Sequence, residues 1–329
     1  MSMREDTYKL EELYLSQYAV KSKDTKGRVV EIEPCPLRTD FQRDRDRIIH
    51  SKSFRRLKHK TQAFIAPEGD HFRTRLTHTL EVSQIARTIA RALFLNEDLT
   101  EAIAMGHDLG HTPFGHTGER VLAALTGGDF SHNKQSLRVV ETLENDGEGL
   151  NLTFEVRDGI LNHRLSCTPL TAEGFTVMLA DKIAYVNHDI DDAVTAGMIT
   201  AAELPVGACK LLGYSKRERI NTLVYDAAAN GKGGKVHLSD GCQAALSELR
   251  AFMFERVYMP NARSEEEVRA EALVEALFKK FTKNPEEMPE FYLKLLDKYK
   301  TETVVCDYIA GMTDGYAMKI SGSYITPKF

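Results

Sequence analysis

Apolar residues recur at intervals of three and four in two long stretches of the chain. In residues 76–95 this spacing predicts an amphipathic helix that carries His78 near its first turn. Residues 171–196 are predicted to form a second such helix. The apolar stripes are Val82, Ile85, Ala86, Ile89 and Leu93 in the first helix, and Leu179, Ile183, Val186 and Ile190 in the second. The second helix also has a polar stripe that we expect to face a functional site, made of Asp181, Tyr185, His188, Asp189 and Asp192.

The rest of the pattern is also mostly helical. A helix over residues 99–109 is predicted to carry His107 and Asp108 at its C-terminal end, where Gly110 and Pro113 stop it. Further helices are predicted over residues 137–143, 155–163, 244–257, 265–281 and 289–299, and short strands only over 29–32 and 235–238. We therefore expect an all-α fold in which residues 1–329 form a single helical domain. Its core would span about residues 38–200 and its C-terminal helical lobe about 201–329.

Composition excludes several classes of protein. Of the 329 residues 42% are hydrophobic, which is ample for a buried core. No stretch of about 18 apolar residues occurs and residues 1–20 are rich in charge, so we expect no secretion, no membrane insertion and a cytoplasmic location. The five cysteines are scattered and form no C-x-x-C pair, which is typical of reduced cytosolic thiols. A bound metal would therefore not be held by sulfur.

The charge distribution limits the kinds of binding partner that the protein is expected to have. The net charge of −5 and the pI of about 6.2 argue against a dedicated nucleic-acid binder. Residues 43–60 are nevertheless strongly basic, and Arg73 and Arg75 follow closely. This run is either a solvated helix face or a grip on an anionic ligand, most simply a polyphosphate, and it leaves weak nucleic-acid binding open. Four of its members have no assigned role, since phosphate, another subunit or nothing would suit them equally: Arg55, Arg56, Lys58 and Lys60.

Residues 105–119 gather three histidines and two carboxylates between helix breakers, which indicates a metal-centred active site. Neighbouring residues on a helix point about 100° apart, so His107 and Asp108 can hold one ion only with ligands from other segments. His78 and Asp181 supply them. Two imidazoles and two carboxylates suit Mn²⁺, Fe²⁺, Co²⁺, Ni²⁺ or Zn²⁺, and Mg²⁺ less comfortably, so the identity of the metal stays open.

These four residues match a known signature. His78, the pair His107-Asp108 and Asp181 resemble the H…HD…D pattern of the HD-domain metal-dependent phosphohydrolases, an all-α superfamily. Longer strings resemble the bacterial deoxynucleoside triphosphate triphosphohydrolases, often called dGTPase-like proteins. The strings are residues 43–50, 54–58, 75–79, 106–119, 132–138, 149–153 and 307–314, so that the resemblance spans about residues 38–316.

The resemblance implies hydrolysis of a dNTP to the deoxynucleoside and inorganic triphosphate, by attack at the α-phosphorus with departure of the 5′-oxygen. That step needs a cation to offset the phosphate charge, an acid for the leaving oxygen, and basic side chains that hold the triphosphate. His116 and Glu119, spaced i, i+3, match the family's catalytic dyad, with His116 as general acid. His111 and His132 match phosphate-contacting positions. Their alternatives are a first-turn helix charge for Glu119 and a structural role for His132.

The remaining assignments concern substrate binding. Arg75 and Lys182 match phosphate-contacting positions, although either would also serve merely to neutralise the carboxylates. Tyr185 and Asp189 lie one and two turns beyond Asp181, and the resemblance implies that they contact the 3′-hydroxyl and favour deoxyribose. Core packing is the alternative for the tyrosine. Nothing in the sequence selects the base.

Two other functions compete with this one. Another HD phosphohydrolase reaction would act on a nucleoside monophosphate, a cyclic dinucleotide or an alarmone. The cyclic dinucleotide branch usually carries a G-Y-P string, whereas Gly315-Tyr316 is followed by Ala317. A non-catalytic nucleotide- or nucleic-acid-binding regulator would not need the proton donor that His116 and Glu119 supply. Family members form tetramers or hexamers, so the resemblance also implies a homo-oligomer.

Overall fold

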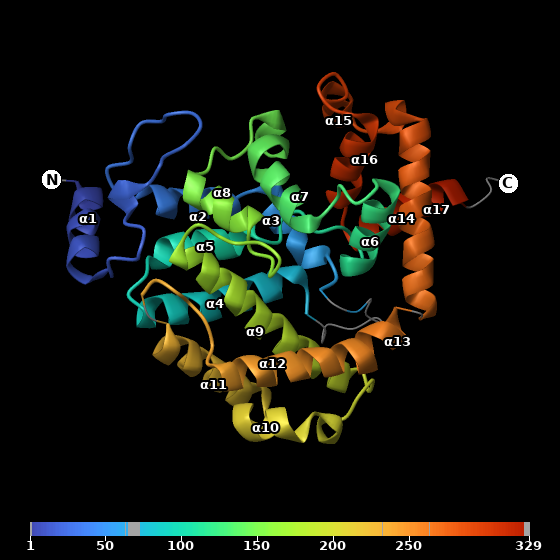
Figure 1. The fold of residues 1–329 in the computed structure, drawn as a ribbon. Coiled ribbons are helices and arrows are strands. Elements are labelled where there is room, and N and C mark those ends of the chain that lie inside the picture. The colour runs from blue at the N-terminus through green and yellow to red at the C-terminus, as the bar shows by residue number, and fades with distance from the viewer. Residues whose placement is uncertain (1, 63, 65–72, 232, 263, 326–329) are drawn as a thin grey trace. The chain divides into compact units, whose positions relative to one another are not determined.

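The computed structural model describes residues 2–62, 64, 73–231, 233–262 and 264–325, and Figure 1 shows the fold. The described residues form helices and no strand, and β-bridge residues occur only singly, at Thr61, which pairs with Thr74, and at Lys235. The all-α prediction is thus confirmed. The two strand predictions, 29–32 and 235–238, are wrong. The side-chain amide of Asn151 satisfies the backbone of Val30: its oxygen accepts from Val30 N–H at 3.1 Å and its nitrogen donates to Val30 C=O at 2.8 Å. Val30 therefore needs no hydrogen bonds from a neighbouring strand.

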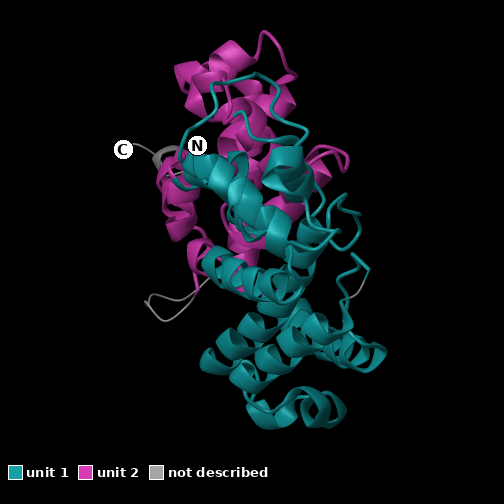
Figure 2. Cartoon of the chain, turned by 90° about the vertical axis from the view of Figure 1, so that its left-hand side faces the viewer, with its two compact units in different colours: residues 1–49, 78–107, 151–261 teal, residues 50–77, 108–150, 262–329 magenta. Residues whose placement is uncertain are grey.

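The chain divides into two compact units that interleave along the sequence (Figure 2). Unit 1 comprises residues 1–49, 78–107 and 151–261, and unit 2 comprises residues 50–77, 108–150 and 262–329. The helix α4 (Arg75–Ala92) contributes its first residues to unit 2 and the others to unit 1. The sequence-based division near residue 201 stays a prediction.

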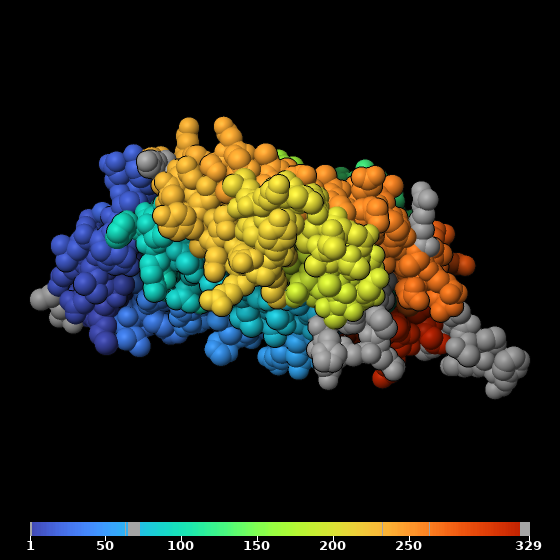
Figure 3. All heavy atoms as spheres, turned by 90° about the horizontal axis from the view of Figure 1, so that it is seen from below, coloured from blue at the N-terminus to red at the C-terminus, as the bar shows by residue number. Residues whose placement is uncertain are grey.

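Unit 1 is built from long helices around α9 (Ala172–Thr195). Its other α-helices are α1 (Met3–Tyr14), α2 (Asp40–Ile49), most of α4, α5 (Glu97–Gly106), α8 (Phe154–Leu161), α10 (Val206–Leu212), α11 (Lys216–Asn230), α12 (Asp240–Met253) and α13 (Met259–Asn261). Short 3₁₀ turns lie at Ser22–Asp24 (η1) and Ala201–Glu203 (η5), and a π-helical segment, η6, covers Phe254–Tyr258. In the space-filling view α10 and α11, yellow to light orange, lie at the surface (Figure 3), whereas most of α9 is buried.

The ends of the central helices in unit 1 follow local chemistry. The Thr171 hydroxyl accepts from Gly174 N–H and begins α9, and the Asn96 side chain caps α5 by accepting from two backbone amides. α5 ends at Gly106, three residues before the predicted end, and His107 is its C-cap. Gly106 is required for packing, since a Cβ there would lie 2.4 Å from a side-chain carbon of Ile160 on α8. This close approach fixes the residue that precedes His107.

Unit 2 is built around the 19-residue helix α14 (Glu265–Lys283). Its other α-helices are α3 (Lys52–Arg56), α6 (Gly115–Leu125), α7 (His132–Arg138), α15 (Glu290–Leu295), α16 (Thr301–Ala310) and α17 (Asp314–Ile325). 3₁₀ turns lie at Leu57–His59 (η2), Asn145–Gly147 (η4) and Pro285–Glu287 (η7), and a π-helical segment, η3, covers Val139–Leu143.

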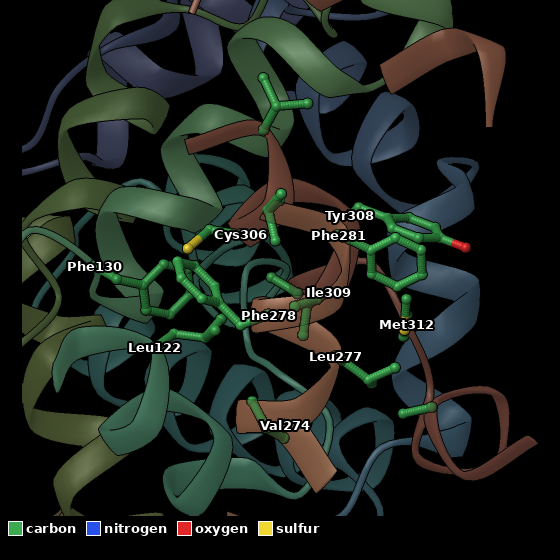
Figure 4. Close-up of a cluster of buried hydrophobic side chains, with 14 of the residues drawn as sticks. Leu122, Phe130, Val274, Leu277, Phe278, Phe281, Cys306, Tyr308, Ile309 and Met312 are labelled. Atoms are coloured by element: carbon green, nitrogen blue, oxygen red, sulfur yellow. The ribbon is translucent and has the colours of Figure 1, made fainter. Parts of the chain in front are cut away.

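The core of unit 2 holds α6 against α14 and α16 (Figure 4). Leu122 on α6 packs in one buried cluster with Val274, Phe278 and Phe281 on α14 and Ile309 on α16. Burying side chains of this size stabilises the fold by about 1.5–3 kcal/mol each. The cluster therefore fixes α6, the helix that carries His116 and Glu119.

Candidate active site

In unit 1 three predicted metal ligands converge from three elements. His78 lies on α4, His107 directly follows α5, and Asp181 lies on α9. The Asp181 Oδ1 atom is 3.1 Å from His78 Nε2 and 4.0 Å from His107 Nε2, and the two imidazole centroids are 5.8 Å apart. Both histidines are almost fully buried. Two nitrogen donors and one carboxylate oxygen are thus gathered within reach of one cation.

The orientation of His107 suits metal ligation. Its Nδ1 lies 2.7 Å from the carbonyl oxygen of Ala104, and only a protonated Nδ1 can donate there. The lone pair is then on Nε2, the atom nearer Asp181. A backbone carbonyl that fixes the tautomer is the usual second contact of a ligating histidine. The donor set fits a divalent cation, and Asp108, joined to His107 by a peptide bond, would add a second carboxylate.

Beyond Asp181, the polar stripe of α9 meets α12 and η6. The Tyr185 hydroxyl oxygen accepts from Arg250 Nε at 2.8 Å, and the Tyr258 hydroxyl donates to Asp189 Oδ2 at 2.5 Å. Burial raises the pKa of Tyr185 to about 12, against the opposing charge of Arg250, so the phenol stays protonated. Core packing alone does not describe Tyr185, because its polar end binds a guanidinium.

Lys182 has a different environment from the other members of this stripe. Its side chain is 8% exposed, and burial followed by the charge of Arg250 lowers its pKa. Within the described part of the chain no ion pair or hydrogen bond of the ammonium group is found, so Lys182 does not neutralise Asp181. Lys182 therefore lies near a second cation, Arg250, and no carboxylate of the described residues is paired with the lysine. Such an arrangement attracts an anion.

Sequence reasoning missed Arg250 and Tyr258. Arg250 lies inside the predicted helix 244–257 and looks like a solvated charge, while Tyr258 lies one residue beyond its end. The structure changes from α12 to the π-helical η6 at Phe254, and a period of 3.6 cannot show that change. The sequence offers one signal for these two residues. Arg250 and Tyr258 are eight positions apart and follow the apolar stripe of the predicted helix 171–196.

In unit 2 the carboxylate of Asp108 is held from two sides. Arg75 Nη1 donates to Asp108 Oδ2 at 2.9 Å, and His111 Nε2 lies 3.3 Å from Oδ1. Arg75 is 1% exposed and also donates to the carbonyl oxygen of Gln62 at 3.0 Å. Arg75 thus does neutralise a carboxylate here, and its contact with phosphate stays a prediction.

The four predicted catalytic side chains lie together in unit 2. His111 and His132 stack with centroids 4.1 Å apart, and His111 and His116 lie 5.6 Å apart. Glu119 accepts from His132 through Nδ1 and through the backbone N–H, each at 2.9 Å, whereas His116 Nδ1 is 3.5 Å from Glu119. Glu119 therefore binds His132 more closely than His116. Because α6 begins at Gly115, Glu119 is not a first-turn charge.

The charges in this group follow from burial and neighbours. Burial opposes the ionised form of Glu119, but the contacts with His116 and His132 outweigh it and hold the pKa of that carboxyl far below its usual range. Burial, and then the charge of Arg75, pushes the pKa of His111 well below 6.5, so His111 is neutral near pH 7. Side-chain atoms of Asp108, His111 and His132 lie within 4.8 Å of one another. The site thus combines the ionised carboxylate of Glu119 with the neutral imidazole of His111.

The basic run has no common role. Lys60 is buried and donates to the carbonyl oxygens of His111 and Ala310, and burial lowers its pKa to about 7. It supports the segment that bears His111. Arg45 binds Asp98 and Glu101 on α5, and Arg55 and Lys58 are exposed. A single phosphate-binding face is therefore not found at these residues.

Comparison with known proteins assigns the class first. Residues 75–186 match the HD domain, and residues 236–322 match a phosphohydrolase-associated domain. A deoxyguanosinetriphosphate triphosphohydrolase-like protein of Caldanaerobacter subterraneus subsp. tengcongensis is 57% identical over 97% of this chain and 94% of its own length. Another protein of that name, from Clostridium perfringens strain SM101, is 49% identical over 100% of this chain and 99% of its own. The chain belongs to this deoxyguanosinetriphosphate triphosphohydrolase-like family of HD-domain hydrolases.

A solved structure is also similar, that of a hypothetical protein from Aquifex aeolicus. Its TM-score is 0.49 at 21% identity, over 84% of this chain and 67% of that one. Among the described residues no helix has the length and the apolar composition needed to cross a membrane.

Proposed function

We propose that this protein hydrolyses deoxynucleoside triphosphates to the deoxynucleoside and inorganic triphosphate. One observation carries the proposal, the order of side chains along α9. Asp181 lies beside two imidazoles, Lys182 follows as a buried cation, and Tyr185 and Asp189 follow as oriented polar groups. A metal-bound phosphate, a polyphosphate chain and a sugar would find their partners in that order.

The metal would be held by His78, His107, Asp108 and Asp181. A divalent cation at such a set offsets the charge of a phosphoryl oxygen and lowers the pKa of bound water. The donor atoms observed in unit 1 support this assignment, because soft sulfur is absent and imidazole and carboxylate prefer Mn²⁺, Fe²⁺, Co²⁺, Ni²⁺ or Zn²⁺, with Mg²⁺ a poorer match.

The chain's own groups would perform the remaining work. Water adds to the α-phosphorus, the bond between that phosphorus and the 5′-oxygen breaks, and the 5′-oxygen receives a proton. We assign that proton to His116, because its side chain is 68% exposed and can therefore meet a substrate, and because its Nδ1 lies 3.5 Å from the Glu119 carboxylate, which would orient the imidazole. Glu119 would also hold His132 toward the phosphates.

Binding of the triphosphate would rest on three cations, Lys182, Arg250 and Arg75. Burial and then the charge of Arg250 lower the pKa of Lys182, and an incoming polyphosphate would relieve the repulsion that Arg250 exerts on the lysine. Arg75 would contact phosphate through donors that Asp108 and Gln62 leave unused. Tight ionic contacts at the leaving chain align the reacting bond.

Selection of deoxyribose would rest on the two tyrosines. Tyr258 donates to Asp189 and Arg250 donates to Tyr185, so all four side chains are fixed before a sugar arrives. A 2′-hydroxyl needs a hydrogen-bond partner, and groups that are already bonded to one another would not supply it. The proposal is tested by incubating the protein with Mn²⁺ and each of the four dNTPs and rNTPs, followed by chromatographic identification of the products.

A further inference from the structure

Unit 2 contains a cavity apart from the residues assigned to the reaction. It has a volume of about 170 Å³ and is bounded by α3, η3, η4, α15 and α16. Its apolar wall comes from Leu109, Val139 and Leu143, and two aromatic rings, Phe291 and Tyr292, form another side. Ligand pockets for larger organic molecules measure roughly 300–1,000 Å³. The cavity is therefore too small for a nucleoside triphosphate, and a compact ligand fits it better.

The three carboxylates at this cavity are already engaged. Asp307 receives three hydrogen bonds from Arg138, at 2.7–2.9 Å, and one from Gln135 at 2.9 Å. Glu144 accepts from the backbone amides of Lys52 and Ser53, the first two residues of α3, and from the Ser53 hydroxyl. Asp146 pairs with the Lys52 ammonium at 3.4 Å. The acidic groups thus have partners and do not demand a cation.

The guanidinium of Arg56 lines the same cavity and is poorly matched. With the described residues it forms one hydrogen bond, from Nη2 to the Ser53 hydroxyl at 2.8 Å. Its Nε is buried without an acceptor, and among the described residues Arg56 forms no ion pair. A guanidinium has five N–H donors in a planar fork that matches carboxylate or phosphate oxygens. The unused N–H donors of Arg56 therefore suit a ligand that carries an oxyanion.

We propose that this cavity binds a small oxyanion carried on an aromatic ring. The oxyanion would accept from Arg56, while the ring would lie against Phe291, Tyr292 and the apolar wall. Size supports a single ring, since a dry cavity of about 150 Å³ holds a benzene molecule. Leu109 lies between Asp108 and Gly110 in sequence, so a bound ligand would contact the segment that carries a predicted metal ligand.

Phenyl phosphate is the probe, measured by isothermal titration calorimetry against the full chain without any dNTP. We expect saturable binding with one molecule per chain, weaker binding of inorganic phosphate, and none of neutral phenol. Arg56→Gln is expected to lower the affinity for phenyl phosphate at least tenfold. Arg55→Gln is the matched control, because Arg55 is the preceding residue, exposed and outside the cavity wall, and it is expected to leave the affinity unchanged.

A second variant tests the proposal independently, in case Arg56→Gln does not fold. Leu143→Phe fills the cavity without touching a charge, and it should weaken phenyl phosphate binding while the circular dichroism spectrum stays that of the wild type. Equal affinity in wild type, Arg56→Gln and Leu143→Phe would overturn the proposal, since the probe would then bind elsewhere, for example at the histidines. No saturable binding to the wild type would overturn it too. Neither result depends on the proposed reaction.

Discussion

Glu119 Oε1 accepts from the backbone N–H and from ring Nδ1 of His132, each at 2.9 Å, and the same Nδ1 lies 3.0 Å from Glu119 Oε2. They come from different helices, α6 and α7, and both belong to unit 2. The sequence pairs Glu119 with His116 through i, i+3 spacing, yet His116 lies farther away at 3.5 Å. One carboxylate thus organises two imidazoles, an arrangement that helix periodicity alone does not show.

Glu119→Gln is expected to lower kcat by tenfold to a hundredfold. Hydrogen bonds to a charged group contribute about 1.5–3 kcal/mol, and each 1.4 kcal/mol is about a factor of ten in rate. The substitution should also change how the free energy of unfolding depends on pH. Because the folded pKa of Glu119 is depressed, its contribution is present above its ordinary pKa of 4.5 and is lost as the pH falls below that value. Chemical unfolding of both proteins at pH 4 and pH 7 checks this, and parallel pH profiles would speak against it.

His116→Ala is expected to retain metal and bind dNTP while losing on the order of 10²–10⁴ in kcat, because only the proton donor is removed. The side chain is 68% exposed, so the fold should survive the change. Steady-state kinetics with metal analysis decide the matter. An unchanged rate would place the acid elsewhere, with His132 as the next candidate.

Asp181→Asn is expected to abolish metal retention and turnover, since the carboxylate whose oxygen lies between two imidazoles would be lost. Asp191→Asn is the matched control on the same helix, because Asp191 is 41% exposed and pairs with Lys216. Metal content after dialysis is the measurement. Full metal occupancy in Asp181→Asn would remove this group of residues from consideration.

Tyr258→Phe is expected to reduce the preference for dNTP over rNTP in kcat/KM by about tenfold. The change removes the hydroxyl that orients Asp189, and a buried polar group that loses its partner costs about 1–3 kcal/mol. Tyr225→Phe, at a tyrosine that is 78% exposed, is the control and should leave the preference unchanged. If both variants discriminate like the wild type, Tyr258 has no part in sugar selection.

Periodicity was sufficient for the main helices. Residues 76–95 and 171–196 were predicted, and α4 and α9 occupy Arg75–Ala92 and Ala172–Thr195. The spacing of polar residues on α9 also placed Asp181, Tyr185 and Asp189 on one face. The sequence could not predict contacts between helices. The hydrogen bond from Tyr258 to Asp189, for example, depends on the π-helical segment η6. The close pairing of Glu119 with His132 depends likewise on how α6 and α7 pack.

The bond that breaks is the most direct test of the central claim. A dNTP labelled in its α- and γ-phosphates is incubated with the protein and Mn²⁺, and the products are separated by ion-exchange chromatography. We expect an unlabelled deoxynucleoside and one intact triphosphate that carries both labels. Deoxynucleoside monophosphate with pyrophosphate, or deoxynucleoside diphosphate with phosphate, would contradict it, even though the protein would still be a hydrolase.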